Sequence, residues 1–486
     1  MELTRLLEVF YLDIKSFLNT VCEQIKYKPV RPGISDELEQ HINDVKEEYI
    51  AKGMKDNEAE EKAVLQMGNA EDIGKKLNKI HKPRLDWKLI ILICILIGFG
   101  IFAVIIKENS NSIFGMTANI RNTIKYIIIG FLLSIGIYFF DYRKLKKHSG
   151  LIYLIATFIV LSSLIPGISW RINGVYYTRL IGSISFPIAT LVLPLYLISF
   201  IGFITKNKKE NIVKIHFGSK EHKINKRLIE VTILAIISLL SMLLIRSFTN
   251  MIILTVSYII VSTIKIIKDK ENSKKKLILM YGTVITLTIF SIIYIFLQHS
   301  YRWERISSFI NSENDLSGSG YVQMLQKETL QKAKILGEVE NLSVPINDSI
   351  LNFESNYTFI YLIGKCGLLV AVIIAITTIL ISVRLIINAK NIKEQYGKLL
   401  IVGLSLLFIL QSFATIFMNL SIGIQVDVNL PFVTYGSAYF IVNIVSIAII
   451  LSIYRRKDIS IISTDDDKKR SGIHIGKWRI NIERNA

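Results

Sequence analysis

Apolar residues run along most of this chain in long continuous stretches, separated by short segments that are rich in lysine and arginine. Each stretch is about 20 residues long, the length that a helix needs to cross the hydrocarbon core of a bilayer. Only a helix satisfies its own backbone hydrogen bonds over such a run. We therefore predict ten membrane-spanning helices, at approximately 88–107, 124–141, 150–166, 183–204, 228–245, 250–267, 277–297, 357–383, 399–419 and 434–454.

The fifth and sixth predicted spans are separated by a very short link, from Arg246 to Asn250. This region can be read as two spans or as one bent helix. A transmembrane β-barrel is excluded because its strands would show alternating apolar and polar residues, not continuous apolar runs. The predicted fold class is an all-α polytopic membrane protein.

The first 87 residues have a different pattern, in which apolar positions at helical spacing lie among many charged residues. Serine or asparagine can cap the start of a helix, and glycine commonly follows its end. These signals occur in the order Ser35, Gly53, Asn57, Gly68 and Asn69. We expect a cytoplasmic helical prefix domain over residues 1–87, and we expect the first span to begin near Trp87.

The basic residues gather on one side of the predicted membrane topology. Clusters lie at 143–147, 206–227, 268–276 and 455–457, whereas the intervening links carry only isolated basic residues. Because positively charged loops stay in the cytoplasm, we predict a multi-pass protein of the bacterial plasma membrane with both termini in the cytoplasm. No signal peptide is recognisable at the start of the chain.

The composition changes this picture little. Hydrophobic residues make up 51% of the chain and charged residues only 20%, which is too apolar for a soluble protein. The formal charge of +19 is explained by the basic loops, so we do not expect nucleic-acid binding. The three cysteines and seven histidines form no metal-ligand spacing, and no cofactor motif occurs. We expect neither a metal ion nor a cofactor.

A long polar segment, residues 298–356, falls on the outer side of this topology, and loops of this length are commonly functional. It contains Arg302 and Arg305 on either side of Trp303, and the glycines Gly318 and Gly320. The two glycines do not form a phosphate-binding loop, because no strand precedes them and no lysine follows in the required place. We interpret them as a turn.

Three groups of residues from about 150 to 456 resemble the SEDS family of cell-wall proteins, the FtsW/RodA/SpoVE group. The sequence Leu-Pro-Phe-Val-Thr-Tyr-Gly-Ser at 430–437 is similar to the family's closing motif Leu-Pro-Phe-x-Ser-Tyr-Gly-Gly. Asn-Gly at 173–174 resembles part of an element that precedes a span in the family. The family's outer-loop pattern is matched, in order, by Arg305, Phe309, Asp315, Gly320, Tyr321, Gln323 and Gly337. The prefix resembles a helical permease-prefix domain.

The resemblance implies glycosyl transfer, in which SEDS proteins polymerise Lipid II beside a class B penicillin-binding protein. It implies a site for a lipid-linked peptidoglycan precursor that carries a diphosphate. Arg302 and Arg305 are the candidates for binding the diphosphate, because guanidinium groups form charge-assisted contacts with phosphate oxygens. The other candidate substrate-binding residues are Asp315, Tyr321, Gln323, Thr434 and Tyr435.

The chain departs from the family where the chemistry is expected. The family has a motif Thr-Asp-Phe-Ile-Phe, followed by Glu-Glu-x-Gly, and its aspartate is regarded as catalytic. That aspartate corresponds to Asn356 here, and an amide cannot accept a proton at neutral pH. Thr190 and Leu193 replace an intramembrane glutamate and lysine of the family. Residues 247–250 replace Pro-Asp-x-Gly, and residues 425–427 replace Pro-x-Thr-Gly. Glu354 is therefore either a solvated loop residue or a relocated base, and Asp315 and Asp348 are weaker alternatives for the base.

Three functions remain open from the sequence. The first is a SEDS paralogue that binds the lipid-linked precursor and regulates wall synthesis with weak or no catalysis. The second is an active polymerase with a relocated base, and the third is a transporter. We favour the first, in cell division, cell shape or sporulation, because of Asn356. Against a transporter, no nucleotide motif occurs, and we expect no buried charged pair that would mark an ion route.

Overall fold

The structure is a computed structural model. It describes residues 13–81, 84–109, 116–165, 167–172, 175–181, 184–206, 212–217, 220–268, 319–349, 355–434, 438–457, 474–475 and 478–479. The chain divides into two compact units, of which one holds residues 1–85 with 455–486 and the other holds residues 86–454. The predicted span at 277–297 lies outside the described residues.

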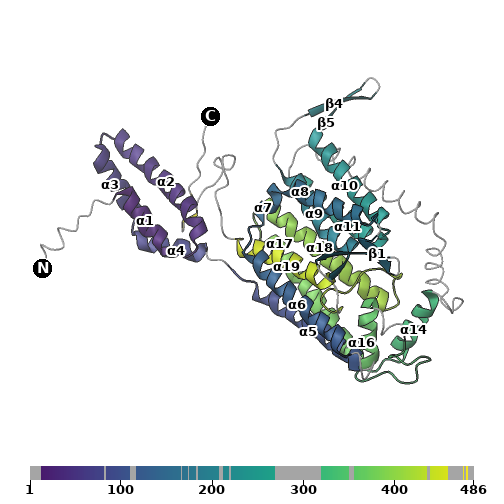
Figure 1. Cartoon of the computed structure of the whole chain (residues 1–486). Coiled ribbons are helices and arrows are strands. Elements are labelled where there is room, and N and C mark those ends of the chain that lie inside the picture. The colour runs from purple at the N-terminus through teal and green to yellow at the C-terminus, as the bar shows by residue number, and fades with distance from the viewer. Residues whose placement is uncertain are drawn as a thin grey trace, which may run out of the picture. The chain divides into compact units, whose positions relative to one another are not determined.

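The described part of the first unit contains four α-helices around a small apolar core (Figure 1). They are α1 (Ile14–Gln24), α2 (Arg31–Ala51), α3 (Asp56–Met67) and α4 (Ala70–Ile80), with a short 3-10 turn at Lys28–Val30 between the first two. The core joins all four helices through residues such as Phe17, Val21, Ile42 and Val64. The sequence analysis did not predict α1.

Local capping signals in this unit were predicted in part. Asn69 caps α4, because its side chain accepts hydrogen bonds from the backbone N–H groups of Glu71 and Asp72. Gly68 ends α3 with a φ of 87°. Ser35 was a wrong cap: α2 begins at Arg31, since the proline that follows fits the first turn of a helix. Asn57 was also wrong, because α3 already begins at Asp56.

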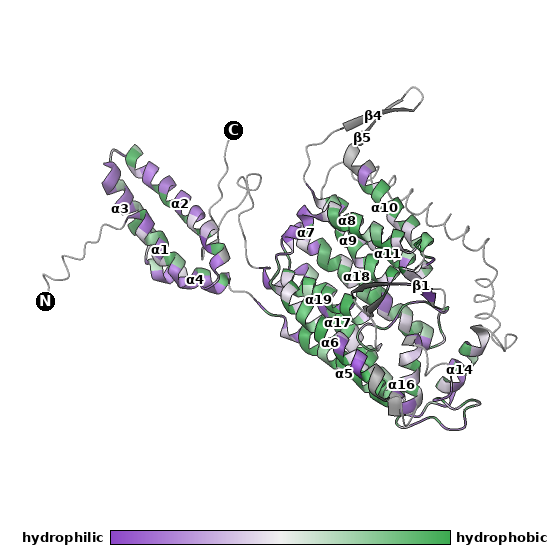
Figure 2. Ribbon diagram, in the orientation of Figure 1, coloured by the Kyte–Doolittle hydropathy of each residue, from purple (hydrophilic) through white to green (hydrophobic). Residues whose placement is uncertain are grey.

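The second unit is a bundle of apolar helices, shown as mostly green ribbons in Figure 2. Within the described residues, six helices are long and apolar enough to cross a membrane: Trp87–Lys107, Ile120–Phe139, Ile188–Thr205, Phe248–Ile267, Leu368–Lys390 and Gln395–Asn419. Three shorter apolar helices, Ser149–Ser162, Glu230–Leu244 and Tyr439–Arg455, coincide with further predicted spans. The all-α polytopic fold class is confirmed.

The helices of the bundle, with their full bounds, are α5 (Trp87–Asn109), α6 (Met116–Phe139), α7 (Arg143–Lys147), α8 (Ser149–Ser162), α9 (Ile188–Thr205), α10 (Lys226–Leu244), α11 (Phe248–Lys268), α14 (Ser319–Gln331), α16 (Thr358–Cys366), α17 (Leu368–Lys390), α18 (Gln395–Asn419) and α19 (Ala438–Arg455). The short link after residue 245 separates two helices, α10 and α11, so the single bent helix is excluded.

Helix α9 forms the centre of the bundle. It is apolar on all sides, and 78% of its span is buried against other parts of the protein, compared with 11% for α6. A helix that is apolar all round belongs in an interior, whether of protein or of lipid. Helices α8, α11 and α18 pack directly against α9. Helix α6, by contrast, presents its apolar side chains to the surroundings, which suits a lipid-facing helix.

Short strands occur between the helices, and the sequence analysis did not predict them. Strands β1 (Ser169–Ile172), β2 (Val175–Ile181) and β3 (Ile184–Pro187) form an antiparallel sheet between α8 and α9. Two hairpins complete the set, β4 (Ile212–Phe217) with β5 (Lys220–Asn225) and β6 (His474–Ile475) with β7 (Trp478–Arg479). Because residues 184–187 are a strand, α9 begins later than the predicted span.

Residues 319–349 and 355–366 are folded against the bundle. Helix α14 packs on α16, and both lie at the same end of the bundle in Figure 1. Backbone hydrogen bonds join residues 334–339 to the junction of α16 and α17, where Gly367 has a φ of 93°. Gly320 lies in the first turn of α14, so our interpretation of this glycine as part of a turn was wrong. Its neighbours are apolar at helical spacing and bury one face of α14.

Candidate functional site

We call one end of the bundle the loop end. It is formed by the described residues 163–165, 167–172, 175–181, 184–187, 245–247, 319–349, 355–366 and 420–434. Asn356 lies there in a single 3-10 turn, Ser355–Tyr357, that leads directly into α16. The turn and the helix are fixed from α18 by Asn419, whose side chain is fully buried.

The Asn419 side chain makes hydrogen bonds in both directions. Its Nδ2 donates to the carbonyl oxygen of Asn356 at 3.0 Å, and its Oδ1 accepts from the backbone N–H of Ile360 at 3.1 Å. The first four N–H groups of any helix have no partner within that helix. Asn419 therefore caps α16 from a different helix and holds the Asn356 segment in place.

A buried lysine lies beside this segment. Lys107, in the last turns of α5, is only 5% exposed, and its Nζ lies 4.8 Å from the centre of the Tyr361 ring. A cation over an aromatic face is attracted by the negative charge of the ring face. Ionisable groups buried in membrane proteins are expensive and often functional. The sequence analysis missed Lys107, because a single lysine at the end of an apolar run resembles an ordinary interfacial residue.

The glutamates of the loop end that the structure describes form structural ties. Glu328 accepts hydrogen bonds from Ser343 and Lys332. Burial tends to raise the pKa of Glu328, but these hydrogen bonds hold the pKa below its ordinary value. Glu338 forms an ion pair with Lys365 at 2.6 Å. Lys365 occupies a position where the family pattern has glutamate.

The predicted site residues fall into two groups. Arg302, Arg305, Asp315, Glu354 and Tyr435 lie outside the described residues.

The other predicted residues are placed by the structure, but not all together. Tyr321 and Gln323 lie on α14, where Gln323 is buried and Tyr321 packs against the main core. Thr434 lies in a separate recess between α5, α6 and α19. At this recess the backbones approach closely, since a Cβ atom on Gly100 would overlap the carbonyl oxygen of Phe432. Thr434 and the residues on α14 therefore pack against the helices around them and do not share one recess.

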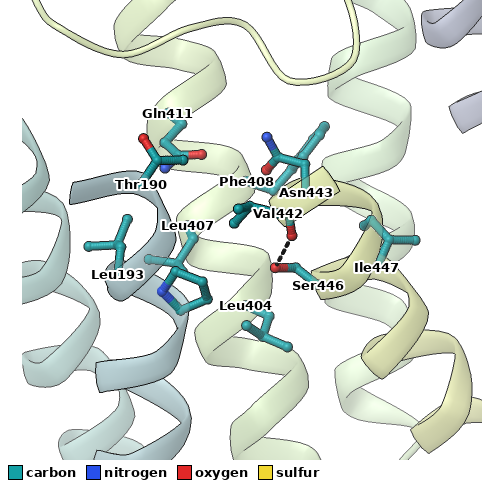
Figure 3. Close-up of a pocket in the computed structure, with 11 residues that line it drawn as sticks. Thr190, Leu193, Leu404, Leu407, Phe408, Gln411, Val442, Asn443, Ser446 and Ile447 are labelled. Atoms are coloured by element: carbon teal, nitrogen blue, oxygen red, sulfur yellow. Dashed lines mark hydrogen bonds between the residues drawn. The ribbon is translucent and has the colours of Figure 1, made fainter. Parts of the chain in front are cut away.

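An interior recess lies beside Thr190 and Leu193, the positions that the sequence analysis interpreted as replacing a charged pair of the family (Figure 3). Thr190 and Leu193 line it from α9, and Figure 3 shows Thr190 near Gln411 of α18 at one end, with Asn443 of α19 facing them. The Nδ2 of Asn443 donates to the carbonyl of Tyr439 in its own helix. The described lining is thus neutral, with apolar side chains below these polar groups.

A second polar recess lies at the loop end itself. Its walls come from strand β2, the start of α9, the turn between α10 and α11, the segment after α18 and the start of α19. The lining residues are Tyr176, Ala189, Ile245, Arg246, Ser247, Asn250, Asp427 and Tyr439. Residues 247–250 and 427 belong to segments in which the chain departs from the family pattern. The departure was the only sequence signal for this recess.

A buried ion pair joins the residue before α5 to α17, and the sequence analysis did not predict it. Arg384 donates to both carboxylate oxygens of Asp86 at 2.8–3.0 Å, and Asn388 donates to the same carboxylate at 2.7 Å. The Asp86 carboxylate also accepts from the backbone N–H of Leu89, at the start of α5. The side chain of Asp86 is 1% exposed. With its oxygens fully engaged, this carboxylate ties two helices together and does not form an ion route.

Metal ligands were also sought. Among the residues that the structure describes, no three histidine, cysteine, aspartate or glutamate side chains are close enough to hold a metal ion.

Comparisons with known proteins match this architecture. A family profile described as "Cell cycle protein", FTSW_RODA_SPOVE, matches residues 86–459. The probable peptidoglycan glycosyltransferase FtsW of Nitrosomonas europaea is 24% identical over 390 residues, which cover 77% of this chain and 94% of that protein. The peptidoglycan glycosyltransferase MrdB of Escherichia coli K12 is 26% identical over 180 residues, 36% of this chain and 48% of that protein.

A solved structure shares the fold. It is a chain from a study titled "Structural coordination of polymerization and crosslinking by a peptidoglycan synthase complex". The TM-score is 0.58 at 15% sequence identity, and the alignment covers 77% of this chain and 98% of that chain.

Proposed function

This chain belongs to the FtsW/RodA/SpoVE family of membrane proteins, and from that membership we propose that it binds a lipid-linked precursor of peptidoglycan and takes part in cell-wall synthesis with weak or no polymerase activity of its own. The SEDS-type membrane fold is the premise. The binding role and the lack of strong catalysis are the proposal.

One feature of the sequence carries the proposal: in our comparison with the family pattern, Asn356 corresponds to the catalytic aspartate. An acceptor hydroxyl must lose its proton as it attacks the anomeric carbon, and a positioned base contributes about 10²- to 10⁴-fold to such a step. An amide cannot take up that proton. The turn that carries Asn356 is nevertheless held firmly by Asn419, so the scaffold around the position is retained without the base.

Two further features support weak catalysis. The recess at Thr190 and Leu193 is lined by neutral groups, where the family pattern has a charged pair. The described glutamates at 328 and 338 are engaged with their own partners, so neither is available as a base in this arrangement.

The membrane placement of the proposal follows from the charge pattern. Basic clusters at 143–147 and 455–457 favour a cytoplasmic location for these segments and for both termini. The loop end would then face outwards, where a lipid-linked precursor presents its headgroup. A class B penicillin-binding protein is the partner that we propose, because a relative with this fold was studied in a peptidoglycan synthase complex.

The test is Lipid II polymerisation by the purified full-length protein, with and without a partner transpeptidase, alongside direct measurement of Lipid II binding. We expect binding by the natural protein, with product formation at or near background. Asn356→Asp should increase polymerisation without reaching the level of an active relative, because Thr190 and Leu193 also differ. Strong polymerisation by the natural protein would contradict the proposal, and so would failure to bind Lipid II.

An active polymerase with a relocated base is the second candidate. It is favoured by one observation, the carboxylate of Asp427 in the recess at the loop end. Glu354, two residues before Asn356, is the other candidate base. If the natural protein polymerises strongly, Glu354→Gln and Asp427→Asn should be compared, and the variant that abolishes the reaction identifies the base.

A further inference from the structure

Two adjacent aliphatic side chains project from the segment that follows α14. Ile335 is 73% exposed and Leu336 is 64% exposed. Both lie within the long segment that the sequence analysis placed on the outer side as a polar loop. Exposure alone does not identify what covers them, because scattered apolar residues are common on protein surfaces. Their position relative to the membrane helices does.

The backbone holds this pair at the start of α17. The carbonyl oxygen of Lys334 accepts a hydrogen bond from the N–H group of Leu368 at 2.9 Å, and the carbonyl oxygen of Ile335 accepts from Leu369 at 3.1 Å. The first N–H groups of a helix have no partner within that helix, so these two bonds cap α17. Ile335 and Leu336 are therefore fixed at the level of the first turn of α17.

Gly367 allows the two segments to come this close. Its φ of 93° lies in the left-handed region, and a Cβ atom at this position would lie 2.6 Å from the carbonyl oxygen of Ile335 and 2.8 Å from the Cα atom of Leu336. On the other side of the pair, the N–H group of Gly337 donates to the carbonyl oxygen of Cys366 at 3.1 Å. Because it is held on both sides, the pair cannot shift along the axis of α17 without breaking these bonds.

The exposed stripe of α17 gives the level of the membrane. Exposed apolar side chains recur at helical spacing from Leu368 in the first turn of α17 to Ile387 in its last turn. At about 1.5 Å per residue this stripe is about 30 Å long, which is the thickness of the hydrocarbon core of a bilayer. The stripe therefore covers the hydrocarbon only if the hydrocarbon begins at the first turn of α17. Ile335 and Leu336 project at this level.

The charged residues beside the pair also fit a membrane boundary. Lys334 forms an ion pair with Glu340 at 2.7 Å, and Lys365 forms one with Glu338 at 2.6 Å. Lysine side chains at such a boundary pack their stems along apolar surface and keep their charge in the polar layer. The charges around the pair are thus neutralised in the polar layer, while the two aliphatic side chains extend away from it.

We propose that Ile335 and Leu336 insert into the hydrocarbon of the leaflet at the loop end and anchor residues 319–349 to the bilayer. Lipid is the partner because the pair continues the lipid-facing stripe of α17. Since α14 belongs to this segment and packs on α16, the anchor fixes the distance of α14 from the bilayer. The inference requires a membrane protein and does not depend on the proposed function.

The first test measures the depth of residue 336 in lipid nanodiscs. The full-length protein, with its three cysteines replaced by alanine, carries a nitroxide label at Leu336→Cys. Electron paramagnetic resonance then compares collisions of the label with oxygen, which concentrates in lipid, and with a nickel chelate, which stays in water. Val372→Cys, on the exposed stripe of α17, is the lipid reference, and Asp348→Cys, an exposed position in the same region as the pair, is the water reference.

We expect the ratio of oxygen to nickel collisions at residue 336 to match the ratio at residue 372 and to exceed the ratio at residue 348 several-fold. A ratio equal to that at residue 348 would overturn the anchor. Adding a penicillin-binding protein tests the other possible occupant. If residue 336 is accessible to nickel in the protein alone and becomes protected only with this partner, the pair binds a protein, and the anchor is again overturned.

A second experiment needs no label. Leu336→Asp places a charge at the membrane boundary, whereas Leu336→Met, its matched control, keeps the position apolar. In nanodiscs, hydrogen–deuterium exchange of peptides that cover residues 364–370 should be about tenfold faster in Leu336→Asp, because losing the burial of one leucine changes an equilibrium by about this factor. Exchange in Leu336→Met should match the natural protein. If position 336 lies in water, both variants exchange like the natural protein, and this result would overturn the anchor.

Discussion

Replacing Asn419 by alanine should loosen the segment that carries Asn356. In the natural protein the Asn419 side chain accepts from the N–H group of Ile360 and donates to the carbonyl group of Asn356, and it also donates to the carbonyl of Thr415 in its own helix. Ile360 is 0% exposed, so water cannot easily replace the lost acceptor. The Asn356 carbonyl is only partly buried, and its loss should cost less.

The magnitude follows from these two groups. Leaving a buried donor unsatisfied costs about 1–3 kcal/mol, and about 1.4 kcal/mol corresponds to a tenfold change in an equilibrium constant. We therefore expect local opening of the first turn of α16 to increase about 5- to 150-fold in Asn419→Ala. Asn419→Asp should have a smaller effect, because a carboxylate still accepts from Ile360 but cannot donate to Asn356.

Hydrogen–deuterium exchange with mass spectrometry measures this opening directly, on peptides that cover residues 356–362. The control is Asn443→Ala, since the Nδ2 of Asn443 bonds only to the carbonyl of Tyr439 within its own helix. Exchange at residues 356–362 should be unchanged in the control. If exchange there is equally slow in Asn419→Ala, or equally fast in both variants, Asn419 does not cap α16.

Three other predictions follow from the bundle. Asp86→Leu should lower the free energy of unfolding in detergent by about 3–5 kcal/mol, because it leaves the Arg384 guanidinium without its buried partner. Adding Arg384→Met should recover part of that loss. If the two substitutions lower the free energy of unfolding additively, this reasoning is contradicted. Gly100→Ala should lower the unfolding temperature, since its Cβ would overlap the carbonyl of Phe432, whereas Gly98→Ala on the same helix should not, because its Cβ meets no atom within 4 Å. A cysteine introduced at Ser421 should react with a membrane-impermeant maleimide in intact cells; reaction only after lysis would invert the predicted orientation.

Short-range signals in the sequence predicted several local features correctly. Single apolar helices lie at eight of the ten predicted positions, because hydrophobicity adds along a segment and needs no knowledge of its neighbours. The predicted span 357–383 was wrong as one helix, since Gly367 divides it into α16 and α17, and 277–297 lies outside the described residues. Asn69 and Gly68 were recognised for the same reason, since a cap bonds to its own helix. Ser35 and Asn57 failed because a better start, at Arg31 or Asp56, lay a few residues earlier.

The candidate site was predicted only as far as the family pattern extends. The replacement of aspartate by Asn356 could be read from the sequence, because the position is fixed by neighbouring aromatic and glycine residues. The recess around Arg246 and Asn250 could not be predicted, since its walls come from five segments that lie far apart in the sequence. Asp427 lies 177 positions after Asn250 in the sequence, and no local pattern connects the two residues.

The sequence by itself therefore determined the all-α membrane class, the position of most apolar helices and which loops are basic, and it predicts that a catalytic carboxylate is missing at Asn356. All of these depend on residue type and local spacing. Only the tertiary structure decided which polar groups become partners. The tie from Asn419 to the Asn356 turn, the ion pair between Asp86 and Arg384, and the lysine at 107 beside an aromatic ring each join different helices. In an apolar bundle a buried polar group must find a partner across a helix interface, and that choice depends on which helices pack together.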